Sequence, residues 1–180
     1  MDKSDIRDIK KELEHDLDSK RYEHTLGVAY TATCLAMRYG YDMEKAYITG
    51  LLHDCAKCMS SKDKFEYCEK HDIPISEVEQ DNPSLLHAKV GAEMSWRKFD
   101  IEDPEIYQAI FYHTTGHPHM SLLDKIIYIS DYMEPHRDEA PNLDLVRKQV
   151  FVDIDQALLT ILKDSVAYLD KSDKTVDPMT

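Results

Sequence analysis

Apolar residues recur at three- and four-residue steps along most of the chain, which is the spacing of one buried face of an α-helix. Ile6, Ile9, Leu13 and Leu17 show this spacing first, and similar sets follow in later segments. The pattern predicts helices over residues 5–17, 20–39, 43–57, 61–71, 84–98, 103–113, 120–134 and 142–170.

Glycine and proline mark several helix ends. Gly40 follows the second segment as a C-terminal helix glycine, and Pro104 stands in the first turn of a later helix. The segment 120–134 is apolar on most sides, which is typical of a central buried helix. We therefore expect an all-α, single-domain helical bundle over residues 1–170, with its motifs in about 20–140, followed by a polar tail over 171–180.

The composition agrees with one helical domain. The chain has 180 residues, of which 42% are hydrophobic, so it can bury a core without disulfides. Its 5 Gly and 7 Pro are too few for the many tight turns of a β-sandwich or barrel. Cys34, Cys55, Cys58 and Cys68 lie in or beside predicted helices, which favours reduced thiols and a cytoplasmic location. No segment approaches the about 20 apolar residues of a membrane span, so we expect no membrane partner.

The charge of the chain restricts its partners. The formal net charge is −13, from 35 acidic and 22 basic residues. Because the average surface field repels a long polyanion, nucleic acid is not expected as a partner. A small phosphorylated ligand is compatible with this charge if a few cations, metal ions included, reverse the field locally.

The pair His53 and Asp54 follows the apolar residues Leu51 and Leu52 near the end of a predicted helix. Burying a bare carboxylate there is costly unless a cation pairs with it, and a metal ion would supply that cation. Both side chains can converge on one ion if the helix is ending. Lys57 lies three residues after Asp54, where its ammonium would meet an oxygen of a metal-bound phosphate.

Four further candidate ligands lie in separate segments. His24 lies on a predicted helix, His87 near a helix start, His113 at a helix end and Asp131 on the apolar segment 120–134. In chain order, 28, 32, 25 and 17 residues separate the His, His-Asp, His, His and Asp positions. A single histidine on an apolar face is usually an ordinary core residue, but five segments that each supply a ligand favour a metal site.

The order of His24, His53, Asp54 and Asp131 resembles the H…HD…D pattern of the HD phosphohydrolase superfamily, whose fold is a helical bundle. The two remaining histidines resemble its dinuclear branch. The similarity is closest to the YqeK-type symmetrical bis(5'-nucleosyl)-tetraphosphatases, in residues 53–57 (HDCAK), 84–92 (SLLHAKVGA), 113–116 (HTTG) and 120–137 (MSLLDKIIYISDYMEPHR). It extends over about residues 20–170, and Cys55 and Cys58 depart from the apolar or small residues of the pattern.

The resemblance implies a metal-dependent hydrolase that cuts diadenosine tetraphosphate symmetrically to two ADP. It implies metal ligation by His24, His53, Asp54, His87, His113 and Asp131, with catalytic roles for Asp54 and Lys57. One or two transition-metal ions would bind, with iron the choice by resemblance and manganese or zinc as alternatives. The metal would lower the pKa of a bound water and offset charge on the transferring phosphoryl group.

The same resemblance implies a set of substrate contacts. They are His24, Lys57, His87, His113, Thr114, Asp131 and Arg137, with the polar tail near residues 171–175. Lys57 and Arg137 would stabilise the departing ADP. A homodimer is compatible with the sequence.

Other functions share these ligands. Because fold and metal ligands do not fix the substrate, a nucleotidase or a cyclic-nucleotide phosphodiesterase is the alternative enzyme. A nucleotide-sensing HD protein without turnover is the alternative from another class, and it would usually lack one of the ligands.

Several other polar residues have ordinary structural explanations. Cys55 and Cys58 have C-x2-C spacing, but no second pair follows, so two ordinary thiols are expected. Asp124 lies three residues after Ser121, which predicts a capping box as readily as a contact toward Asp131.

Loop and surface positions also allow two interpretations. His117 and His119 lie in a loop, where solvated histidines are commoner than substrate contacts. Arg137 could form a surface ion pair with Glu134, three residues earlier, but its place after the Asp131 helix favours a fork that holds a phosphate.

Overall fold

The computed structural model describes residues 3–171, 177 and 179. Within these residues the regular structure is helical and contains no β-strand, which confirms the all-α prediction. The elements are α1 (Lys3–Asp16), α2 (Ser19–Tyr39), α3 (Met43–Leu52), α4 (Ser61–Lys70), α5 (Glu77–Asp81), the 3-10 helix η1 (Pro83–Leu85), α6 (Leu86–Arg97), α7 (Pro104–Tyr112), α8 (Leu122–Met133), α9 (Leu143–Gln149) and α10 (Ile154–Leu169).

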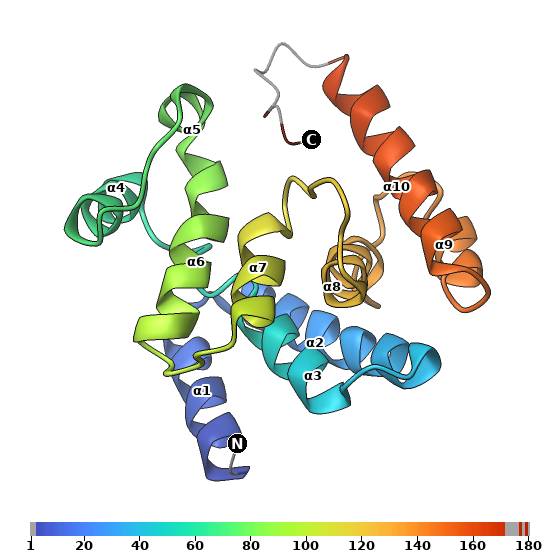
Figure 1. The fold of residues 1–180 in the computed structure, drawn as a ribbon, viewed down its shortest axis with the longest axis horizontal. Coiled ribbons are helices and arrows are strands. Elements are labelled where there is room, and N and C mark those ends of the chain that lie inside the picture. Colours follow the sequence, from blue (N-terminus) through green and yellow to red (C-terminus); the bar gives the residue numbers. More distant parts are fainter. Residues whose placement is uncertain (1–2, 172–176, 178, 180) are drawn as a thin grey trace.

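Helix α8 lies at the centre of the bundle and contacts α2, α3, α7, α9 and α10. Figure 1 shows α2 and α3 side by side beneath α8, with α6 and α7 on one side and α9 and α10 on the other. Leu123, Ile126, Ile127 and Ile129 of α8 are fully buried, as expected for a helix that is apolar on most sides. The predicted central helix is confirmed.

The pair α2 and α3 is joined by a tight turn at Gly40. This residue has φ +67° and donates its N–H to the Ala36 carbonyl, so it closes α2 in the left-handed conformation that glycine adopts without strain. Gly50 allows the two helices to approach closely, because a Cβ built on it would lie 2.7 Å from the Ala29 Cα.

Helix α3 ends earlier than the predicted limit of residue 57. It stops at Leu52, and the following residues form short turns in which Cys55 N–H donates to the Leu52 carbonyl (3.1 Å) and Lys57 N–H to the Asp54 carbonyl (2.9 Å). The His53 side chain competes for a backbone group, because its Nδ1 lies 2.7 Å from the Gly50 carbonyl oxygen. The early end turns His53 and Asp54 toward the inside of the bundle.

The predicted single helix over 142–170 is wrong, because the structure forms α9 and α10 with a break between them. Asp153 caps α10 by accepting from the backbone N–H groups of Asp155 and Gln156. Arg38 Nε donates to the Phe151 carbonyl at 2.7 Å, and Tyr39 donates to the Val150 carbonyl. These contacts with the end of α2 use backbone groups that a continuous helix would bond internally. Helix α5 was also not predicted.

The predicted polar tail lies mostly beyond the described residues, and so does the substrate contact proposed near 171–175, apart from Lys171. Among the described helices, none has the length and apolar character needed to cross a membrane.

Candidate metal centre

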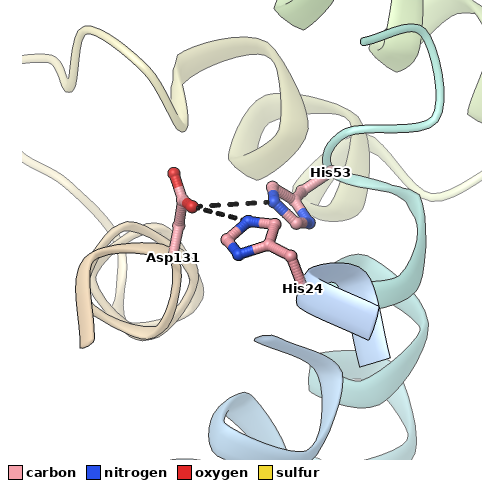
Figure 2. Close-up of side chains that lie close together, drawn as sticks. All are labelled: His24, His53 and Asp131. Carbon is pink, nitrogen blue, oxygen red and sulfur yellow. Dashed lines mark ion pairs between the residues drawn. The ribbon is translucent and has the colours of Figure 1, made fainter. Parts of the chain in front are cut away.

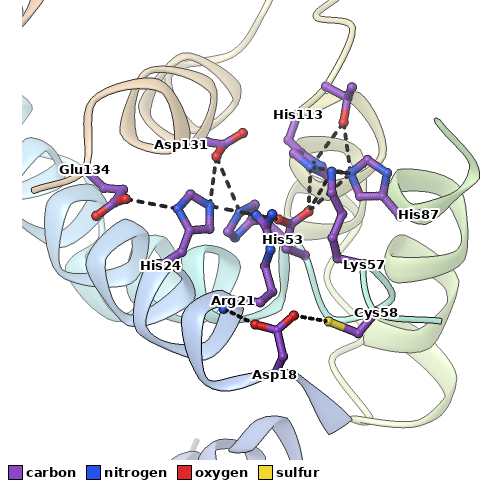
Figure 3. A network of polar contacts seen from close by, with 12 residues as sticks. Asp18, Arg21, His24, His53, Lys57, Cys58, His87, His113, Asp131 and Glu134 are labelled. Atoms are coloured by element: carbon purple, nitrogen blue, oxygen red, sulfur yellow. Dashed lines mark hydrogen bonds and ion pairs between the residues drawn. The ribbon is translucent and has the colours of Figure 1, made fainter. Parts of the chain in front are cut away.

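The six predicted ligand side chains meet between α2, α3, α6, α7 and α8, as Figure 3 shows for the five that it labels. The helices deliver them from different positions. His24 lies in the second turn of α2, His53 caps the end of α3, His87 lies in the first turn of α6, His113 caps α7 and Asp131 lies in the last turn of α8. Asp54 follows His53 and is 2% exposed. Folding thus gathers residues that lie far apart in the sequence.

Three of the histidines are held by the same backbone contact. In each, the imidazole Nδ1 lies against the carbonyl oxygen three residues earlier. The pairs are His53 with Gly50 (2.7 Å), His87 with Ser84, and His113 with Ile110 (2.7 Å). A carbonyl oxygen can only accept, so Nδ1 carries the hydrogen and Nε2 presents its lone pair to the centre of the cluster.

His24 is oriented by a carboxylate instead of a carbonyl. Its Nδ1 lies 3.1 Å from Glu134 Oε1, and its Nε2 lies 3.0 Å from Asp131 Oδ1. Figure 2 shows the His24 and His53 rings turned toward the same Asp131 oxygen. The Nε2 atoms of both rings are buried and have no hydrogen-bond partner among the described residues. Two buried imidazole nitrogens that lack a hydrogen-bond partner and face the same carboxylate oxygen indicate a site for a cation.

Asp54 connects two halves of the cluster. Its Oδ1 lies 3.2 Å from His87 Nε2 and 3.4 Å from His113 Nε2. Its Oδ2 lies 3.6 Å from His53 Nε2 and 3.9 Å from His24 Nε2. Two sets of candidate ligand atoms, each within 4.8 Å of one another, overlap here: His24, His53 and Asp131, and His53, Asp54 and His113. Mixed imidazole and carboxylate donors suit a divalent metal ion, so this cluster is a candidate site for one.

The ionisation of the cluster agrees with metal ligation. Burial disfavours the imidazolium form and lowers the pKa of His53 to about 4, and burial also lowers the pKa of His87. Burial alone would raise the pKa of Asp54, but the nearby imidazoles of His53, His113 and His87 outweigh it and hold the pKa well below its usual value. At neutral pH His53 and His87 therefore offer neutral imidazoles beside the ionised Asp54 carboxylate.

The predicted substrate contacts surround these ligands. Lys57 Nζ lies 3.0 Å from His87 Nε2 and 3.8 Å from Asp54 Oδ1. Thr114 Oγ1 lies 3.2 Å from the Nε2 atoms of both His87 and His113. The Lys57 and Thr114 side chains thus border one half of the cluster.

Arg137 borders the other half. Its Nη2 donates to Asp131 Oδ1 at 3.0 Å, and its Nε to the Asp131 carbonyl at 3.1 Å. The alternative ion pair with Glu134 is not formed, because the buried Glu134 carboxylate contacts His24 and accepts from the His136 N–H at 2.7 Å.

Sequence reasoning missed Arg21 and the role of Glu134. Arg21 Nη1 donates to Asp54 Oδ2 at 2.7 Å. Helical spacing was an available signal for both, since Arg21 precedes His24 by three residues and Glu134 follows Asp131 by three. Their partners, Asp54 for Arg21 and His24 for Glu134, lie in distant segments of the chain that come together in the folded structure.

The remaining polar candidates have structural partners. Ser121 and Asp124 form the capping box at the start of α8, and Asp124 Oδ2 also contacts His117 Nε2 at 2.9 Å. Cys55 is buried, whereas the exposed Cys58 lies with its Sγ 3.5 Å from Asp18 Oδ2. Both cysteines are free thiols.

Comparisons with known proteins agree with this geometry. Residues 21–136 match the family model described as HD domain. The chain is 39% identical to "Bis(5'-nucleosyl)-tetraphosphatase, symmetrical" of Bacillus subtilis (strain 168), over 93% of this chain and 89% of the relative. It is 32% identical to the protein of the same name from Staphylococcus aureus (strain NCTC 8325 / PS 47), over 95% and 88% of the two chains.

A solved structure is similar over the same extent. It is described as a predicted HD superfamily hydrolase involved in NAD metabolism from Clostridium acetobutylicum, with a TM-score of 0.93 and 37% identity over 97% of this chain and 92% of that one. The HD domain match over residues 21–136 contains all six residues of the cluster and ends one residue before Arg137. The chain therefore belongs to the HD domain family and, within it, to the symmetrical bis(5'-nucleosyl)-tetraphosphatases.

Proposed function

We propose that the chain hydrolyses diadenosine tetraphosphate symmetrically to two ADP, using a bound transition metal. The observation that carries this proposal is that imidazole nitrogens gather at both oxygens of Asp54, those of His87 and His113 at Oδ1 and those of His24 and His53 at Oδ2. The similarity over nearly the full length to proteins named symmetrical tetraphosphatases supports the choice of substrate.

The proposed ligands divide between two ions. His24, His53, Asp54 and Asp131 would hold one ion, and Asp54 would bridge to a second ion held by His87 and His113. We propose iron, with manganese or zinc as alternatives. A bound metal of this kind lowers the pKa of a coordinated water and offsets charge on the transferring phosphoryl group.

The other residues of the site bind and orient the substrate. Lys57 and Thr114 lie beside His87, where they would donate to phosphate oxygens. Arg137 lies beside Asp131 and presents a planar guanidinium that can hold a phosphate by two hydrogen bonds. Because these donors fix the phosphates relative to Asp54, geometry determines which phosphoanhydride is cut.

The proposal also concerns the limits of the catalytic domain and the cellular location of the protein. We propose one catalytic domain over residues 1–170, in a cytoplasmic protein. The domain limit is supported by α10, which packs on α8 and so joins the C-terminal segment to the helix that carries Asp131.

The test is to incubate the metal-restored protein with diadenosine tetraphosphate and to resolve the products by anion-exchange chromatography. We expect ADP alone. AMP together with ATP would show that the enzyme cuts a different phosphoanhydride bond. His53→Ala and Asp54→Ala are the negative controls, because each removes a proposed ligand. No cleavage, with rapid hydrolysis of a nucleoside monophosphate or a cyclic nucleotide, would identify a different HD enzyme. Tight binding without any product would identify a sensor.

A further inference from the structure

Two cationic side chains approach Asp54, one at each of its oxygens. Lys57 Nζ lies 3.8 Å from Oδ1, on the side of His87. Arg21 Nη1 donates to Oδ2 at 2.7 Å, on the side of His24. Lys57 has a place in the proposed reaction, whereas Arg21 has none.

Arg21 lies in the wall of a cavity of about 470 Å³ between the start of α2 and the segment that follows α8. His24 and Arg137 line the same cavity, so it opens directly onto the His24 half of the metal centre. A cavity of this size is within the usual range of small-molecule sites. Lys57 and Thr114 are not among its lining residues.

The cavity is lined by polar groups of both charges. Arg21 and Arg137 each contact a carboxylate of the metal centre, so their guanidinium groups lie beside that centre, although Arg137 is itself exposed. The rest of the polar lining comprises the buried Glu134 and the exposed Lys20, Glu23, His136, Asp138 and Glu139. Guanidinium groups bind phosphate, and carboxylates accept hydrogen bonds from ribose hydroxyls and from the amino group of adenine. Guanidinium groups beside the metal centre and exposed carboxylates elsewhere in the lining suit a nucleoside diphosphate whose phosphates point toward that centre.

We propose that this cavity binds the second nucleoside diphosphate half of the substrate, and that Arg21 is the residue that binds its phosphates. The inference rests on the proposed function, in which the substrate consists of two identical halves and is cut at its middle. Lys57 and Thr114 would hold one half, while Arg21 and Arg137 would hold the other. This assignment separates Arg137 from Lys57, whereas the family resemblance places both on the departing ADP. With a single subsite the second half would have no fixed position.

The alternative is that Arg21 only orients Asp54. The structure favours contact with a ligand, because the Arg21 side chain is 28% exposed and makes this one side-chain hydrogen bond among those found in the described part of the chain. The remaining guanidinium donors are therefore available to a molecule in the cavity. Asp54 Oδ2 is also a proposed metal ligand, so a bound ion would compete with Arg21 for that oxygen and leave more of its donors to a phosphate.

The test compares metal-loaded wild type, Arg21→Met and Arg38→Met. Arg38 is the matched control, because it lies at the other end of α2 and contacts the Phe151 carbonyl. Three quantities are measured: metal per chain by elemental analysis, ADP bound per chain at saturation by equilibrium dialysis, and KM for diadenosine tetraphosphate. We expect two ADP per chain in wild type and Arg38→Met, and one in Arg21→Met with unchanged metal. KM should rise roughly 10- to 100-fold in Arg21→Met, as the loss of a charged hydrogen bond implies.

Two results would overturn the inference. Wild type that binds one ADP per chain has no second subsite, even if it cuts the substrate symmetrically. Arg21→Met that loses metal along with ADP would make Arg21 a positioning residue for Asp54. Failure of the proposed function would give a different result from failure of this inference. In that case wild type would still bind two ADP per chain but would not cut diadenosine tetraphosphate.

Discussion

His53, His87 and His113 are each oriented by a hydrogen bond to the carbonyl three residues earlier. At the end of α3 this contact gives the Gly50 carbonyl a hydrogen-bond partner, and at the end of α7 the Ile110 carbonyl accepts from both Nδ1 and the backbone N–H of His113. In all three histidines the same contact selects the tautomer and aims Nε2 at the cluster. A histidine in such a position is prepared for a metal before the metal binds.

Glu134 performs the same task for His24, and its substitution by Gln tests this role. The Glu134 carboxylate is 1% exposed and accepts from both His24 Nδ1 and the His136 N–H. An amide has one acceptor oxygen, so Glu134→Gln must lose one of these two contacts. We expect metal affinity to fall roughly 10- to 100-fold, measured by competition with a chelating dye.

The control for this change is Glu93→Gln, which removes a charge from an ion pair with Arg97 away from the cluster. It should leave metal affinity unchanged. Equal affinity in Glu134→Gln and wild type would show that Glu134 does not support His24.

At the scale of helices, the close contact of α2 and α3 positions both His24 and His53. Gly50 permits this contact, since an added Cβ would lie 2.7 Å from backbone of α2. Gly91 in α6 is the matched glycine, because a Cβ there would meet its nearest atoms at 3.5 Å, which is ordinary contact.

The two glycines should therefore respond oppositely to alanine. Gly50→Ala must separate two backbones, and we expect the free energy of unfolding to fall by roughly 2–3 kcal/mol. Gly91→Ala should be neutral or stabilising by up to about 1 kcal/mol, from the higher helix propensity of alanine. Urea unfolding of metal-free protein measures both. Similar destabilisation by the two substitutions would contradict the special role of the α2–α3 contact.

Helical elements were predictable from the sequence where the periodic pattern alone decides the structure, as in α2 and α8. The pattern failed where side chains compete for backbone groups. His53 ends α3 early, and Asp153 starts a new helix within a run of continuous apolar spacing. Likewise, the six candidate ligands were identifiable by residue type, whereas Arg21 and its partner Asp54 lie 33 residues apart and meet only through packing.

At the scale of the whole molecule, the metal centre joins five helices whose ligands are distant in sequence. Without an ion, the cluster places imidazole lone pairs and carboxylate oxygens against one another in a buried space, which is unfavourable. The centre therefore reduces the stability of the metal-free protein, and a bound ion restores it because the unfolded chain cannot present the same set of ligands.

This coupling predicts how thermal stability depends on metal. Free Mn²⁺ at 100 times its dissociation constant should stabilise wild type by about 2.7 kcal/mol. For a chain of this length that corresponds to a Tm increase of about 5–10 °C, measured by thermal unfolding after chelation and again after metal is added. Asp54→Ala removes a proposed ligand, so its Tm should rise little with Mn²⁺, and its Tm in chelator should fall below that of wild type because Arg21 loses its buried ion-pair partner. An equal metal-induced rise in both proteins would show that Asp54 is not a ligand, and wild type that stays fully active with no detectable metal would rule out the metal centre itself.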